Sequence, residues 1–170
     1  MNENLKPVVE AIQRRFNAQV KEFREEVSLI LEPAHLIDAV TALRDEFNFP
    51  MMQGATAVDY WPEQNPRFNL IYHFYSMTQN HSICLRVPVD GNAPVMPTLE
   101  KIYPNANWHE REIWDMFGIR FDGHSDLRRI LMPADWQGHP QRKDYPLGYE
   151  EVQFTFNFDQ ISLKKPAPRE

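Results

Sequence analysis

The sequence predicts an α+β fold, a two-layer domain with helices on a mostly antiparallel or mixed sheet, followed by an extended C-terminal arm. Two observations carry this prediction. Apolar residues recur at helical spacing in two N-terminal segments and at alternate positions in the segments after them. From Pro133 to Leu147 neither period is present, and this stretch is at the usual limit of about 12 to 15 irregular residues in compact domains. We therefore expect an α+β domain over 1–132 and a partner-docking loop, strand and tail over 133–170.

The first two helices are predicted from apolar residues three and four positions apart. Asn4 is a candidate cap for the first helix, Pro33 opens the second, and Asn48 and Pro50 end it. The apolar face of the first consists of Leu5, Val8, Val9, Ile12 and Phe16, and that of the second of Leu36, Ile37, Val40, Leu43 and Phe47.

Strands are predicted where β-branched and aromatic residues gather or alternate with polar ones. The first is 27–31, and three more follow the second helix at 55–61, 68–74 and 83–89. Residues 78–81 connect the last two and have the composition of a hairpin turn. The expected order is helix, strand, helix and three strands.

A third helix is predicted over 108–118, because Asn107 and Glu110 resemble a capping box and Gly118 is suited to the position after the last turn. On it, Arg111 and Asp115 are four residues apart and can pair for about 0.2 to 0.5 kcal/mol. After a turn at 122–123, residues 127–132 form a short strand or extended segment, and the alternation over 152–158 predicts a strand in the C-terminal arm.

Composition excludes several classes of protein. The chain has 170 residues with 18 Lys and Arg against 24 Asp and Glu, and this net charge of -6 argues against nucleic-acid binding. Its single cysteine, Cys84, excludes an intrachain disulfide, a thiolate zinc site or a cysteine-held iron–sulfur cluster. No window approaches the roughly 18 apolar residues of a membrane span and no signal peptide is present, so we expect any membrane contact to come through a partner.

The charged residues allow competing interpretations. No glycine-rich nucleotide-binding motif is present. Imidazole and carboxylate groups could hold a divalent ion, although a charged helix face and a turn are the more common explanation of such a set: His109, Glu110, Glu112, Asp115, His124 and Asp126. A small self-sufficient enzyme could use part of the same set. Arg128–Arg129 and Arg142–Asp144 could bind an anion, but planar Arg–carboxylate pairs are the more common alternative.

Three blocks in the right order, 109–118, 123–131 and 135–146, resemble the 30 kDa subunit of respiratory complex I. The first contains Glu-Arg-Glu-x-x-Asp-Met-Phe-Gly and the last contains Arg-Lys-Asp-Tyr-Pro. Two positions depart from the family pattern, because Ser125 replaces a usual proline and Gln141 a usual leucine. Both lie in predicted turns or loops, where we expect changes in local stiffness and one apolar contact.

The resemblance implies a non-redox core scaffold subunit in the peripheral arm of a proton-pumping NADH:quinone oxidoreductase, on the cytoplasmic side of the cell membrane. Electrons would pass from NADH through FMN and iron–sulfur clusters of other subunits to quinone, so this chain would hold no cofactor and would not be catalytic alone. The implied partners are the 49 kDa-type D subunit and the cluster-holding B subunit. Membrane-bound hydrogenases and ferredoxin-linked dehydrogenases contain a similar subunit, which leaves the electron donor open.

The resemblance also implies assembly roles for the charged and aromatic motif residues, since Trp, Tyr and Arg dominate interface energetics. Four fix the helix, Glu110, Arg111, Glu112 and Asp115, and five fix the extended region against the partner, Arg128, Arg129, Arg142, Lys143 and Asp144. The remaining motif positions are His124, Asp126, Asp135, Trp136 and Tyr145.

Overall fold

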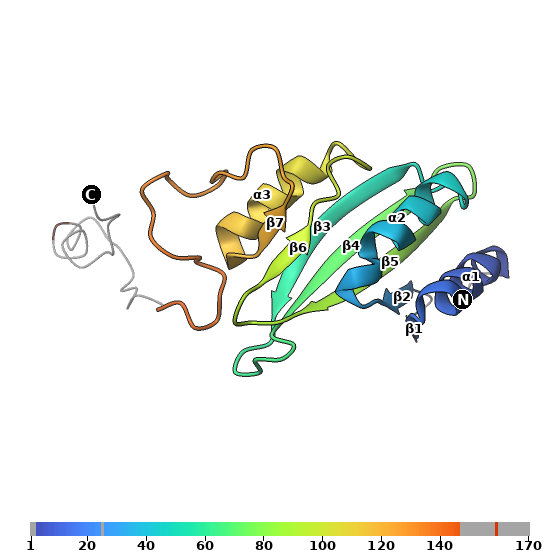
Figure 1. The fold of residues 1–170 in the computed structure, drawn as a ribbon, viewed down its shortest axis with the longest axis horizontal. Helices are drawn as coiled ribbons and strands as arrows, with labels where there is room; N and C mark the ends of the chain where they lie inside the picture. The colour runs from blue at the N-terminus through green and yellow to red at the C-terminus, as the bar shows by residue number, and fades with distance from the viewer. Residues whose placement is uncertain (1–2, 25, 147–158, 160–170) are drawn as a thin grey trace.

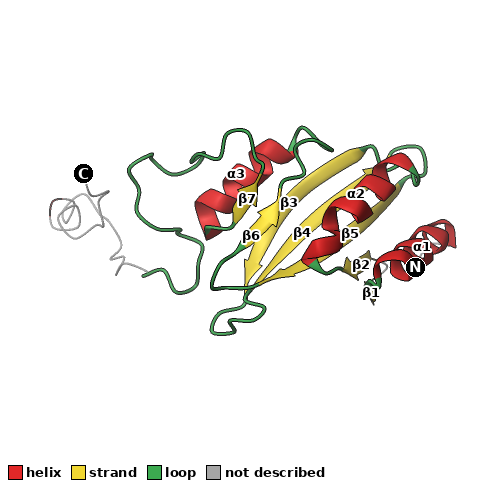
Figure 2. Cartoon of the chain, viewed as in Figure 1, coloured by secondary structure: helices red, strands yellow, loops and turns green. Residues whose placement is uncertain are grey.

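The computed structural model describes residues 3–24, 26–146 and 159. It confirms an α+β fold in which helices cover a five-stranded sheet, and a third helix lies beside the edge of that sheet (Figures 1 and 2). The helices are α1 (Lys6–Phe16), α2 (Leu36–Asp45) and α3 (Ala106–Phe117), with 3-10 turns η1 (Glu3–Leu5) and η2 (Pro33–His35). The strands are β1 (Gln19–Phe23), β2 (Glu26–Ile30), β3 (Met51–Asp59), β4 (Phe68–Ser76), β5 (His81–Val89), β6 (Val95–Pro97) and β7 (Arg120–Asp122).

The five-stranded sheet has the order β1-β2-β5-β4-β3 and is mixed. β2 and β5 run parallel, and every other neighbouring pair is antiparallel. The helix-covered face of the sheet is apolar and shielded from solvent, since Leu70, Tyr72 and Phe74 of β4 are fully buried. They pack in one core with Ile12 of α1 and Leu43 of α2. Alternation along β4 and β5 thus assigns one face to the core.

α3 packs against β3, the last strand of the sheet (Figure 1). Two hydrogen bonds join the chain just before the helix to the start of β3. The Tyr103 hydroxyl donates to the Phe49 carbonyl, and the Asn105 amide donates to the Met52 carbonyl at 2.8 Å. The helix ends at Phe117, and Gly118 follows in the left-handed conformation with φ 75°. This position of Gly118 agrees with the sequence prediction, because a residue without Cβ adopts positive φ at little cost.

Several predicted caps and boundaries are wrong. Asn4 is not at the cap position of α1, because η1 precedes the helix and Leu5 holds that position without a side-chain hydrogen bond. The capping box of α3 is also absent, since the helix begins at Ala106 and Glu110 turns to other donors. The strand predicted over 55–61 begins at Met51, four residues earlier than its pattern indicates, because a bulge between Met52 and Gly54 breaks the alternation.

Three short strands were not predicted. All five residues of β1 are exposed, so its sequence has no alternation of apolar and polar residues. β6 and β7 form a parallel two-stranded sheet from segments of three residues each, too short for any period. The extended segment expected over 127–132 is irregular chain rather than strand. The strand expected over 152–158 lies outside the described residues.

Candidate functional site

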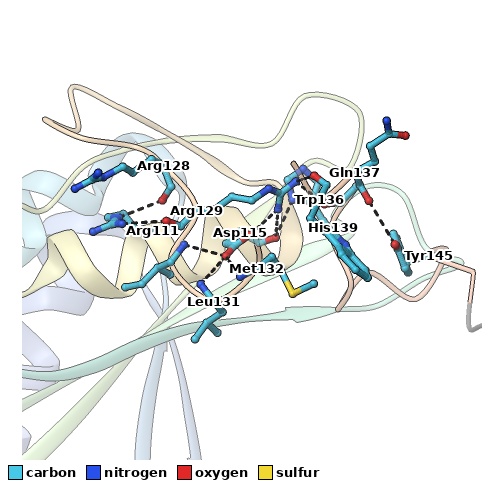
Figure 3. A network of polar contacts seen from close by, with 12 residues as sticks. Arg111, Asp115, Arg128, Arg129, Leu131, Met132, Trp136, Gln137, His139 and Tyr145 are labelled. Atoms are coloured by element: carbon cyan, nitrogen blue, oxygen red, sulfur yellow. Dashed lines mark hydrogen bonds and ion pairs between the residues drawn. The ribbon is translucent and has the colours of Figure 1, made fainter. Parts of the chain in front are cut away.

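The family-like motif residues gather on α3 and on the irregular chain that returns over it (Figure 3). We call residues 127–146 the anchored segment, because side chains of α3 and of the sheet hold it. Backbone N–H and C=O groups without strand or helix partners must find hydrogen bonds elsewhere. In the anchored segment these partners are side chains of α3, of the sheet and of the segment itself.

Asp115 is the centre of the anchoring contacts. Its side chain is fully buried, and one carboxylate oxygen, Oδ2, accepts the backbone N–H groups of Ile130, Leu131 and Met132 at 3.0, 2.8 and 2.9 Å. The other oxygen accepts a charged hydrogen bond from Arg129. Burial alone would raise the pKa of Asp115, but these donors lower it below its ordinary value. The carboxylate is thus held ionised by a concave set of consecutive N–H groups and one cation.

Two arginines bind the carbonyls of the anchored segment. Arg111 of α3, only 7% exposed, donates to the carbonyls of Arg128 and Arg129 at 3.1 and 3.0 Å. Arg129 itself donates onward to the carbonyls of Trp136 and Gly138 at 2.6 and 2.9 Å. The predicted Arg111–Asp115 pair on one helix is therefore wrong, because each side chain binds the returning chain instead.

His139 and Gln141 join the last turn of α3. The His139 ring nitrogen Nδ1 lies 3.0 Å from the Asp115 carbonyl, and the Gln141 N–H donates to the Met116 carbonyl. A Cβ atom on Gly118 would meet the His139 ring at 2.5 Å. Gly118 is thus required twice, by its left-handed backbone and by the close approach of the anchored segment.

A second buried charge network holds the C-terminal part of the anchored segment. Arg67 forms two hydrogen bonds to Asp59, at 2.9 and 2.8 Å, and two to Asp144, at 2.9 and 2.6 Å. The Lys143 N–H donates to Asp59 at 2.9 Å. The guanidinium also lies against the aromatic rings of Trp61 and Phe68. Asp144 thus pairs within its own chain.

Neither Asp59 nor Arg67 belongs to any pattern visible in the sequence. Burial would raise the pKa of Asp59, but hydrogen bonds from Arg67 and from the N–H groups of Lys143 and Trp61 lower it to about 2. The hydrogen bond from Arg67 likewise lowers the pKa of Asp144. Since 77 residues separate Arg67 from Asp144, no local spacing could reveal the pair.

Glu110 has a different environment from Asp115 on the same helix. It is fully buried, and it accepts hydrogen bonds from the Thr98 hydroxyl and the Leu99 N–H, which join α3 to the chain after β6. Burial raises the pKa of Glu110 despite these bonds, and His124 lies 4.0 Å away. His124 is itself engaged, with Nε2 3.1 Å from the Asn107 carbonyl and Nδ1 accepting the Asp126 N–H.

Ser125, which departs from the family pattern, binds the Glu100 carboxylate. Its N–H and its hydroxyl both donate to Glu100, and the Asn107 amide donates to the same carboxylate. These bonds lower the pKa of Glu100 to about 2. A proline at position 125 would lack the N–H donor.

The other motif residues lie outward or act through their backbone. Glu112, Asp135 and the side chain of Lys143 are exposed, and Arg128 forms an exposed ion pair with Asp126. Arg142 lies over the Phe68 ring, and the Tyr145 hydroxyl donates to the Gln137 carbonyl at 3.3 Å. Trp136 contributes its carbonyl to Arg129. Over the described residues, no three His, Cys, Asp or Glu side chains are grouped as metal ligands would be.

Comparisons with known proteins show which family the chain belongs to. A family model described as the 30 kDa subunit of respiratory-chain NADH dehydrogenase matches residues 29–151. The C subunit of NADH-quinone oxidoreductase from Roseiflexus sp. strain RS-1 is 49% identical over 151 residues, which cover 88% of this chain and 86% of the relative.

Two solved structures share the fold. A trypsin-resistant fragment of Nqo5 matches with a TM-score of 0.66 at 25% identity, over 73% of this chain and 99% of the fragment. A chain of the membrane-bound sulfane sulfur reductase, an archaeal respiratory membrane complex, matches with a TM-score of 0.74 at 22% identity. That match covers 99% of this chain and 97% of the other.

Asp115→Asn should release the anchored segment while the sheet stays folded. Removing one partner of a buried, hydrogen-bonded charge pair costs about 3 kcal/mol or more. Here the loss lowers the free energy needed to open the anchored segment locally. Tryptic cleavage at Arg128 and Arg129 should therefore accelerate about 100-fold. The matched control is Asp126→Asn, which removes only an exposed pair worth about 1 kcal/mol at most. Equal cleavage rates in the two variants would contradict the anchoring role.

The Asp59–Arg67–Asp144 network should make the stability of the chain sensitive to acid. The folded pKa of Asp59 is about 2, below its unfolded value, so its contribution is complete above the unfolded pKa and is lost as the pH falls toward 2. The contribution at pH 7 is about 2 kcal/mol. Asp59→Asn should abolish that much of the acid-dependent loss, measured by urea unfolding between pH 7 and 2. The exposed control Asp122→Asn should keep the wild-type slope, and an unchanged slope in Asp59→Asn would contradict the assignment.

Proposed function

Because the chain belongs to the family of the 30 kDa subunit of respiratory-chain NADH dehydrogenase, we propose that it is a scaffold subunit of the peripheral arm of an NADH:quinone oxidoreductase, with no redox centre of its own. The family membership makes it part of a multi-subunit, membrane-associated respiratory complex rather than a self-sufficient enzyme. In the described part of the chain no helix is long and apolar enough to cross a membrane. We place the subunit on the cytoplasmic side of the cell membrane, held there by its partners.

The anchored segment is the proposed contact with the D and B subunits of the complex. The single observation that carries this proposal is that α3 and the sheet hold an irregular segment rigidly by buried charges, while large apolar side chains beside these contacts stay exposed. Trp108 is 60% exposed and Leu131 is 61% exposed. Both belong to the elements that Arg111 joins, since Arg111 lies over the Trp108 ring and binds the carbonyls of Arg128 and Arg129, two to three residues before Leu131. Exposed aromatic and aliphatic residues on a fixed backbone are suited to the centre of an interface.

The roles of the motif residues divide accordingly. Glu110, Arg111, Asp115, Arg129 and Asp144 shape the docking surface from within, since their charged groups bind their own chain. Glu112, Asp126, Arg128 and Asp135 point their polar groups to solvent and are the proposed polar rim. The C-terminal arm over 149–170, of which only residue 159 is described, is proposed to extend the same contact.

The electron donor is proposed to be NADH, in keeping with the names of the relatives. The fold is shared with the sulfane sulfur reductase complex, so fold alone does not select the donor. A flavin- and NADH-binding subunit encoded next to this chain would support NADH. Such a gene would be missing from a ferredoxin-linked or hydrogenase-type relative.

The purified chain should be colourless and contain no stoichiometric iron, zinc or flavin. One cysteine cannot hold a cluster, and Cys84 is buried in the sheet. Absorbance from 300 to 700 nm, expected to be flat, and elemental analysis of the chain purified without refolding would measure this. An iron–sulfur band, or one metal ion per chain, would overturn the proposal of a subunit without a redox centre.

Asp144→Ala should lower quinone reductase activity by lowering the amount of assembled complex. The change leaves Arg67 with one carboxylate and frees the end of the anchored segment. The measurement is the amount of this chain that co-purifies with the membrane complex, together with NADH:quinone activity per assembled complex. Asp38→Asn, an exposed position on α2, is the control and should assemble normally. Normal assembly of Asp144→Ala would contradict the docking role, and a fully assembled but inactive complex would indicate a catalytic one.

A further inference from the structure

The face of the sheet opposite the core, which we call the open face, presents side chains of four strands to solvent. Cross-strand partners in the register share a face. Lys21 of β1, Thr56 of β3, His73 of β4 and Ser82 of β5 are all exposed. The buried core residues of β4 and β5 alternate with positions on the open face. The open face is therefore a continuous surface made of rows of cross-strand partners.

The central row of the open face is not typical of a solvated sheet surface. From edge to edge it consists of Gln19, Ile30, Arg86, Ile71 and Thr56, so that an arginine lies between two isoleucines. Ile71 is only 8% exposed although it lies outside the core cluster, which indicates cover from neighbouring side chains. The long stem of an arginine can cover apolar neighbours while its charged end points outward.

The Arg86 guanidinium lacks a charged partner within the part of the chain that the structure describes. Its Nε atom is buried without a hydrogen-bond acceptor, and no ion pair involves this side chain among the described residues. Its polar neighbours include the Cys84 thiol, whose pKa is raised by burial and lowered in part by Ser28 and Arg86. The Glu26 carboxylate also acts on this thiol but forms no ion pair with Arg86 among the described residues. A partly buried, unpaired cation is costly, and a carboxylate placed against it would form a planar pair.

The charge of the open face also indicates which kind of binding partner suits it. A second copy docked through this face about a two-fold axis at its centre would bring Arg86 toward its own equivalent, which is unfavourable. A segment from another protein that carries an acidic side chain between apolar residues complements the Ile30–Arg86–Ile71 row at every position. Arg is also among the residues most enriched at the energetic centre of interfaces.

We propose that the open face is a second subunit-docking surface, which binds a sister-subunit segment with a carboxylate against Arg86 and apolar side chains against Ile30 and Ile71. This inference rests on the proposed function, because it requires a multi-subunit complex. It concerns the sheet, whereas the first docking surface is the anchored segment beyond α3. Each surface can therefore be altered without touching the other.

The first experiment reverses the charge at the centre of the open face. Arg86→Glu should lower incorporation of this subunit into the purified native complex about tenfold, with the circular dichroism and thermal midpoint of the isolated chain unchanged. Arg120→Glu is the matched control, because it makes the same charge change at a side chain of β7 that is 70% exposed. Incorporation of Arg86→Glu at the level of Arg120→Glu would overturn the proposal.

The second experiment remains informative even if Arg86→Glu fails to fold. Thr56→Cys in a Cys84→Ser background places a single exposed thiol on the open face. Maleimide should label it at least tenfold more slowly in the intact complex than in the isolated chain. Equal rates would overturn the proposal. So would an isolated wild-type chain that is dimeric by light scattering and becomes monomeric in Arg86→Glu, because the occupant would then be a second copy.

The two docking surfaces can fail separately. If Asp144→Ala blocks assembly while both open-face experiments give control values, the anchored segment docks and the open face does not. If the open-face variants block assembly and Asp144→Ala does not, the converse holds.

Discussion

The buried carboxylate of Asp115 is the contact that fixes the start of the returning chain on α3. Residues 127–146 contain no helix or strand, yet their backbone groups lie close to α3 and need hydrogen bonds. Asp115 accepts three consecutive N–H groups, while Arg111 and Arg129 together bind the carbonyls of four residues. Side chains of α3, together with Arg129 of the segment itself, thus do for an irregular segment what a neighbouring strand does in a sheet. This explains why the motif is rich in charge although its charged groups bind backbone of their own chain.

Glu110 and Asp115 show how the same type of side chain serves two purposes on one helix. Both are fully buried. Asp115 faces a cation and three N–H groups, which lower its pKa, whereas Glu110 receives one hydroxyl and one N–H, and its burial raises its pKa. The two carboxylates therefore contribute to the pH dependence of folding stability with opposite signs. Asp115 loses stabilising energy as the pH falls through its folded pKa, and Glu110 loses it as the pH rises through its own. The anchored segment and the attachment of α3 to β6 consequently respond to pH in opposite directions.

The sequence predicted those parts of the fold in which apolar periodicity carries the information. Val8, Ile12 and Phe16 on one side of α1, and Leu70, Tyr72 and Phe74 on one side of β4, face the core as expected. β1 was missed because its five residues are all exposed. The capping box failed because Asn107 binds Glu100, which is nearby only once the chain has folded.

The site shows the same division between local and long-range information. The importance of residues 109–118 and 135–146 was visible as a motif, but their partners were not. Spacing on the helix suggested that Arg111 pairs with Asp115, whereas both bind chain 15 to 18 residues further on. Asp59 and Arg67 had no signal at all, since Arg67 pairs with Asp144 and Asp59 accepts the Lys143 N–H, both near the far end of the described chain. Pairings between distant segments are set by the tertiary fold, which one sequence does not display.

Anchoring by buried charges has a consequence for how the subunit recognises its neighbours. Ordering a flexible segment on binding costs about 1 to 2 kcal/mol per residue in backbone entropy, which weakens an interface. Here that ordering occurs when the chain folds, because Asp115, Arg129 and Arg67 bind inward. The outward side chains, Trp108 and Leu131 among them, can then contribute their apolar burial to association with little further loss. In the proposed complex, buried charges that do not face the partner can therefore control docking as strongly as the residues that do.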